Sequence, residues 1–123
     1  MRWSGACWRR GHAQRDRGQY DRHEPVISAC GGAAMYRRCA VEKVGPFDPD
    51  FVAYLEDVDW GVRAQLRGWS CLYVPGASCF HMGSATTDRP SLNARHALLL
   101  RRNGLILTLK TFPASALVLH LPA

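Results

Sequence analysis

The chain has 123 residues, which is enough for one domain or for part of one. Its apolar fraction of 47% is ordinary for a globular protein, so the composition excludes disorder throughout the chain. The formal net charge is +6 and arginine outnumbers lysine 14 to 2, which suits a phosphorylated ligand, nucleic acid, an anionic membrane or simply a solvated basic segment.

Residues 1–25 hold six arginines against Asp16, Asp21 and Glu24 and show no clear hydrophobic period, so we expect a loop or a disordered segment there. A short apolar run follows, and it predicts a buried strand over about 27–36 that is kinked at Gly31 and Gly32. The glycine pair either permits close approach of a ligand to the backbone or forms a simple bulge.

A short helix is predicted from Arg38 to Val44, where Gly45 and Pro46 stop it, and a turn is predicted over 47–51. The next helix is predicted over 55–67. Its period of three and four residues places an apolar stripe on one face, formed by Leu55, Val58, Val62 and Leu66.

Three carboxylates fall in the first turn of this second helix: Glu56, Asp57 and Asp59. Acidic residues there favour the positive end of the helix dipole. Asp59 and Arg63 are i,i+4 neighbours, which predicts an ion pair between them. Glu56 and Asp57 then remain at the N-terminal end of the helix, where a carboxylate can act as a general base or can simply interact with the helix dipole.

The rest of the chain is predicted to form strands over 71–75 and 77–82 and a long helix over 91–111. His81 ends the second of these strands, and an imidazole there can bind a divalent metal or be a simple surface residue. The apolar stretch 104–123 is interrupted by Lys110 and Pro113, so we expect no transmembrane span.

The five cysteines are odd in number, form no C-x-x-C pair and follow no signal peptide. We therefore expect no disulfide framework and a reducing, cytoplasmic environment. Contact with the inner face of the cell membrane is left open.

Several segments in order resemble family 2 glycosyltransferases, in particular the rhamnosyltransferase-like branch that builds cell walls. The segments are 31–38 (GGAAMYRR), 44–51 (VGPFDPDF), 54–60 (YLEDVDW), Gly68-Trp69, 73–75 (YVP), His81 and Arg102-Asn103. The resemblance covers roughly residues 18–113. It divides the chain into an Arg-rich segment over 1–25, the C-terminal part of a glycosyltransferase domain over 26–113 and a tail over 114–123.

The resemblance implies an inverting, single-displacement transfer of a sugar from a nucleotide-sugar donor to a cell-envelope glycan or lipid-linked acceptor. Asp57 resembles the general base and Glu56 shapes the acceptor site beside it. His81 resembles a ligand of Mn²⁺ or Mg²⁺ on the donor diphosphate. The implied substrate-binding residues are Gly31, Gly32, Ala33, Trp60 and Arg102, although Arg102 equally fits a solvated helix.

The implied fold is α/β, a partial GT-A fold (the nucleotide-diphospho-sugar transferase fold) without its N-terminal nucleotide-binding half. No Asp-x-Asp motif precedes the glycine pair. We therefore expect the chain alone to be an inactive fragment of a polysaccharide-building enzyme, or a half that pairs with a separate nucleotide-binding chain. The alternative is a small basic module that binds nucleic acid or an anionic membrane surface, although no nucleic-acid motif supports it.

Overall fold

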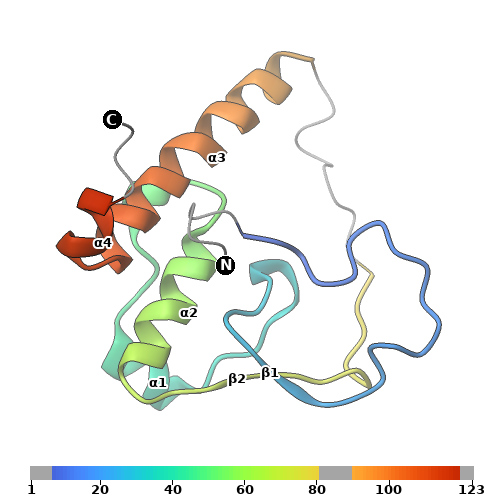
Figure 1. The fold of residues 1–123 in the computed structure, drawn as a ribbon. Helices are drawn as coiled ribbons and strands as arrows, with labels where there is room; N and C mark the ends of the chain where they lie inside the picture. Colours follow the sequence, from blue (N-terminus) through green and yellow to red (C-terminus); the bar gives the residue numbers. More distant parts are fainter. Residues whose placement is uncertain (1–6, 81–89, 120–123) are drawn as a thin grey trace.

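The computed structural model describes residues 7–80 and 90–119, and it is an α/β structure, as predicted (Figure 1). In Figure 1, helix α2 lies between the long helix α3 and a pair of short strands. In chain order the elements are β1 (Glu24–Val26), the 3-10 helix η1 (Gly31–Ala33), α1 (Arg38–Val44), the 3-10 helix η2 (Pro49–Phe51), α2 (Glu56–Leu66), β2 (Cys71–Tyr73), α3 (Pro90–Thr111) and α4 (Ala114–Leu119).

The sheet is a single antiparallel pair in which Glu24 lies opposite Tyr73 and Val26 lies opposite Cys71. The predicted strand over 71–75 is confirmed in its first three residues. The predicted strand over 27–36 is wrong, because the ladder ends at Val26 and the chain passes through a loop into η1. Side-chain hydrogen bonds to α2 replace the ladder: Gln65 Nε2 donates to the carbonyl of Ile27 at 2.8 Å.

The predicted strand over 77–82 is not present in its described part, residues 77–80. The reason is a turn after β2, in which the N–H of Ala77 donates to the carbonyl of Val74 at 3.0 Å across Pro75 and Gly76. Residues 81 and 82 lie outside the described residues.

All three predicted helices are confirmed, the first with its predicted bounds and the others to within one residue at each end. The helix α1 ends where Gly45 takes a φ of +90°, which favours glycine, and donates its N–H to the carbonyl of Val41 at 2.8 Å. Within the described residues no helix is long and apolar enough to cross a membrane.

The main hydrophobic core joins α1 to α2 through Ala40, Val44, Trp60 and Ala64. The apolar stripe predicted for α2 is not the buried face, since Leu66 is 75% exposed while Trp60 is only 8% exposed. The reason is that α1 packs against the face formed by Trp60 and Ala64, which are i,i+4 neighbours.

Candidate functional site

The candidate site lies at the N-terminus of α2, where Asp57 is held by two backbone N–H groups. The N–H of Gly31 in η1 donates to Oδ2 of Asp57 at 2.8 Å, and the N–H of Val58 donates to Oδ1 at 2.8 Å. These two bonds fix the orientation of the carboxylate and leave lone pairs on both oxygens for a further donor. The structure thus brings together two residues that the sequence placed in one site, Asp57 and Gly31.

The Asp57 carboxylate is half-buried, and Gly31, which lies against it, is exposed and has no side chain to cover it. A Cβ at Gly31 would lie 3.6 Å from Cβ and 3.7 Å from Oδ2 of Asp57, in ordinary contact with the carboxyl group. Gly32 and Ala33, the other two residues of η1, are exposed. Of these three small residues, Gly31 contacts the carboxylate, and the part of Gly32 and Ala33 in substrate binding stays a prediction.

Two buried oxygens near Asp57 have no hydrogen-bond partner in the part of the chain that the structure describes. They are Oε2 of Glu56 and the hydroxyl of Tyr36. Burial raises the pKa of the Tyr36 hydroxyl, and the negative charge of Asp57 raises the pKa further. The phenol therefore stays protonated at neutral pH and is able to donate a hydrogen bond.

The segment before η1 is tied to α2 at the same end. Ser28 donates its hydroxyl to the backbone carbonyl of Asp57 at 2.7 Å. This contact joins two segments 29 positions apart and holds the Gly31 loop close to the first turn of α2. Sequence reasoning did not identify Ser28, and its residue type gives no signal for such a contact.

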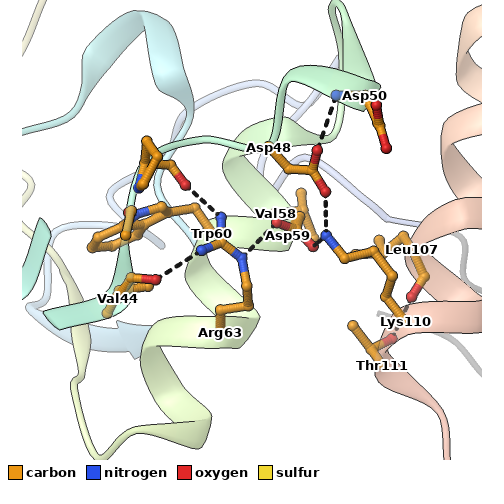
Figure 2. A network of polar contacts seen from close by, with 12 residues as sticks. Val44, Asp48, Asp50, Val58, Asp59, Trp60, Arg63, Leu107, Lys110 and Thr111 are labelled. Carbon is orange, nitrogen blue, oxygen red and sulfur yellow. Dashed lines mark hydrogen bonds and ion pairs between the residues drawn. The ribbon is translucent and has the colours of Figure 1, made fainter.

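Asp59, the third acid of the triplet, is fully buried and belongs to an ion-pair network between α2 and α3 (Figure 2). Its Oδ2 accepts from Nε of Arg63 at 2.7 Å, which confirms the predicted pair, and its Oδ1 lies 2.7 Å from Nζ of Lys110. Figure 2 shows the Lys110 ammonium between Asp59 and Asp48. The sequence did not predict the part played by Lys110, which lies about fifty positions away.

Arg63 extends this network to the end of α1. Its two terminal nitrogens donate to the carbonyls of Val44 at 3.0 Å and Pro46 at 2.9 Å (Figure 2). The guanidinium therefore satisfies carbonyls that the end of a helix leaves unpaired. Asp59 and Arg63 therefore hold α2 in place.

Two other predicted site residues, Trp60 and Arg102, make contacts with other parts of the chain. Trp60 packs edge-on against Tyr36 and donates its indole N–H to the carbonyl of Gly45 at 2.8 Å, a placement that favours a role in the core. Arg102 donates to the carbonyl of Asp50 at 2.5 Å. His81 lies outside the described residues.

No three histidine, cysteine, aspartate or glutamate side chains gather closely enough to hold a metal ion among the described residues. The Asp57 carboxylate can still accept a proton, which is a reaction of the side chain alone.

The chain matches the profile of glycosyl transferase family group 2 over residues 1–119. It belongs to this family. The predicted resemblance to family 2 glycosyltransferases is thus confirmed.

Two relatives of this family bear the name N-acetylglucosaminyl-diphospho-decaprenol L-rhamnosyltransferase and come from Mycobacterium tuberculosis, strains CDC 1551 / Oshkosh and ATCC 25618 / H37Rv. Each is 40% identical over 65 residues, a match that covers 53% of this chain and 21% of the relative. No solved structure matches the chain significantly.

The charge network gives this glycosyltransferase-family chain a predicted pH dependence. Burial by itself lowers the pKa of Lys110, but hydrogen bonds to Asp48 and Asp59 outweigh it and raise the pKa above its usual 10.5. The hydrogen bond from Lys110 lowers the pKa of Asp48 below its usual 3.8. The stabilisation from Lys110 is complete below the usual lysine pKa of 10.5 and is lost as pH rises through the raised pKa of Lys110. The stabilisation from Asp48 is lost as pH falls through the lowered pKa of Asp48.

Replacing the ammonium tests this assignment. In Lys110→Met the alkaline loss of stability should shrink to the part that other groups such as Tyr36 contribute. The acid loss should shrink too, because Asp48 no longer has its charged donor. Melting temperatures measured on both sides of neutral pH check it. A wild-type profile in the variant would show that the network does not couple to folding.

Proposed function

We propose that this chain is the acceptor-side part of a glycosyltransferase in which Asp57 is the general base. The observation that carries the proposal is the half-buried Asp57 carboxylate, oriented by two N–H groups and faced by a glycine without a side chain. Family membership supports sugar transfer as the reaction class. The base removes the proton that a sugar hydroxyl must lose as its oxygen forms a bond, which typically contributes about 100-fold or more to the rate.

The proposed step is a single displacement. The acceptor hydroxyl gives its proton to Asp57, and its oxygen forms a bond to the anomeric carbon of the donor sugar. The bond from that carbon to the nucleoside diphosphate breaks, and the diphosphate leaves with the electron pair. The configuration at the anomeric carbon is inverted. The buried oxygens of Glu56 and Tyr36 supply an acceptor and a donor with which a sugar hydroxyl would pair.

The substrates are proposed from the names of the relatives. A rhamnosyltransferase that acts on a diphospho-decaprenol-linked sugar is 40% identical over the matched part. We therefore propose a lipid-linked glycan as acceptor and a nucleotide sugar as donor, in building the cell wall at the cytoplasmic face of the membrane. The donor would bind outside this acceptor-side part, in another segment of the same polypeptide or in a partner chain.

The implied Mn²⁺ or Mg²⁺, with His81 as one ligand, is part of this proposal only as an expectation of the family resemblance. A basic module for nucleic acid or anionic lipid is not favoured. Three arginines of the chain already form ion pairs within it: Arg10 pairs with Glu24, Arg38 pairs with Glu42 and Arg63 pairs with Asp59.

A chimera tests the function directly. This chain replaces the homologous part of the mycobacterial rhamnosyltransferase, and transfer of rhamnose is measured. Asp57→Asn should lower kcat by about 100-fold, because the amide cannot accept the proton. Glu42→Gln, in an exposed ion pair of α1, is the control and should leave kcat unchanged.

Two outcomes bear on the proposal. An active chimera in which Asp57→Asn keeps full activity would show that Asp57 is not the base. The chain alone, supplied with a nucleotide sugar and Mn²⁺, should turn nothing over, and turnover would show that the donor site lies within this chain after all.

A further inference from the structure

The loop that precedes the proposed base has an unfavourable backbone conformation. Val52 has a φ of +60° and a ψ of −61°, and the N–H of Ala53 donates to the carbonyl of Phe51 at 2.6 Å, which together form a γ-turn of the rare, strained kind. Tyr54 and Leu55 also have positive φ values, 72° and 68°. Three of the four residues in the 52–55 loop thus take conformations that residues other than glycine rarely adopt. Such a loop persists only where its surroundings hold it.

Asn103 of α3 supplies this hold. Its side chain is fully buried, and its Nδ2 donates to the carbonyls of Phe51, Ala53 and Tyr54 at 2.7, 2.8 and 2.8 Å. Its Oδ1 accepts from Nη1 of Arg102 at 3.0 Å, which is consistent with the amide nitrogen facing the loop. One carboxamide thus binds two carbonyls of the 52–55 loop and the carbonyl of Phe51, the residue before the loop.

The contact belongs to a polar stripe along α3. His96, Asn103 and Lys110 are spaced seven residues apart and so share one face of the helix. His96 packs its ring on Tyr54 with the ring centroids 4.3 Å apart, and Lys110 reaches Asp59. The stripe therefore contacts the chain on both sides of Glu56 and Asp57.

We propose that Asn103 is a positioning residue for the Asp57 carboxylate. Its carboxamide fixes the 52–55 loop, the loop sets the direction in which α2 begins, and that direction brings Oδ2 of Asp57 to the N–H of Gly31. That Asn103 orients the Asp57 carboxylate can be tested without any sugar transfer. That this orientation matters for catalysis rests on the proposed function.

The Gly31 N–H provides a spectroscopic readout in this chain without any substrate. A hydrogen bond to a carboxylate moves an amide proton downfield, and the shift changes with pH as that carboxylate takes up a proton. In Asn103→Asp, which has the same shape but turns an oxygen toward three carbonyls, the Gly31 amide proton should move upfield and lose this pH dependence. Leu105→Ala, at an exposed position of α3, should leave both unchanged.

A second pair of variants keeps the test decisive. If Asn103→Asp does not fold, Asn103→Ser retains one donor in a smaller volume and should show the same changes in part. Adding Val52→Gly, which allows the γ-turn without its usual penalty, should restore some of the Gly31 signal. A folded Asn103 variant with the wild-type Gly31 shift and titration would overturn the proposal. Because this readout needs no turnover, a failure of the chimera to transfer sugar leaves it intact.

Discussion

Asp59→Asn should lower the melting temperature of this chain by about 12 °C, because it removes the buried anion that Arg63 and Lys110 share. Loss of one partner from a buried ion pair costs about 3–5 kcal/mol. We expect the lower end, since the side chains of Arg63 and Lys110 are 20% and 33% exposed and water reaches both. About 3 kcal/mol corresponds to about 12 °C or more in a domain of this size.

Asparagine has the shape of aspartate, but it cannot replace Asp59 as the acceptor for both Arg63 and Lys110. The amide has one oxygen and one NH₂ group, so whichever cation faces the NH₂ meets a donor in place of an acceptor. If Arg63 keeps the oxygen, the Lys110 ammonium retains only Asp48, and the link between α2 and α3 is weakened.

The chain offers a matched control in α1. Arg38 and Glu42 form an i,i+4 pair with Nε 2.8 Å from Oε1, the same spacing and arginine atom as in the Arg63–Asp59 pair but in the reverse chain order, and their side chains are 93% and 58% exposed. An exposed pair of this kind contributes about 0.5 kcal/mol or less. Glu42→Gln should therefore shift the melting temperature only slightly. Equal shifts in the two variants would mean that burial does not set the strength of the Asp59 pair.

Local signals in the sequence were enough to predict α1, α2, α3 and the Asp59–Arg63 pair, but not α4, which lies in the segment predicted as a tail. The spacing i,i+4 brings those two side chains together in any helix, and Gly45 ends α1 through its own backbone preference. Asp57 and Gly31 were placed in one site by family resemblance, and the structure brings them together.

Long-range contacts account for the predictions that were wrong or missing. Residues 27–30 have the composition of a strand, but Gln65 and the helix backbone bind this segment in place of a ladder partner. The buried face of α2 was misassigned because the position of α1 decides it, so Trp60 is buried while Leu66 is exposed.

The role of Asn103 could not be predicted from neighbouring residues, since its partners lie 49–52 positions away. The family resemblance includes Arg102-Asn103 but gives Asn103 no role, and the other signal is the spacing of seven residues among His96, Asn103 and Lys110 within a leucine-rich helix. That spacing places three polar side chains on one face, and a polar stripe on such a helix indicates polar partners.

Gly61→Ala should destabilise the chain by about 2 kcal/mol although the change lies inside a helix. A Cβ at Gly61 would lie 2.6 Å from Cβ of Ser28 and 2.7 Å from the carbonyl oxygen of Ile27, closer than real side chains approach. Part of this obstacle is backbone, so no rotation of a side chain relieves it. Overpacking of this kind costs about 3 kcal/mol, and the helix preference of alanine offsets about 1 kcal/mol of it.

The displacement should also reach the proposed base. The segment that Gly61→Ala pushes away carries Ser28, whose hydroxyl bonds the Asp57 carbonyl, and leads directly to Gly31. The Gly31 amide proton should therefore move upfield in this variant together with the fall in melting temperature.

Gly104→Ala is the matched control, because Gly104 is also inside a helix but a Cβ there meets nothing within 4 Å among the described atoms. With no clash, only the helix preference of alanine remains, and it should raise stability by about 1 kcal/mol. The two substitutions are chemically identical and should have opposite signs in thermal or urea unfolding. Stabilisation by both would mean that Ile27 and Ser28 do not pack against α2 at Gly61, and that the Gly31 loop is not held against Asp57 by this contact.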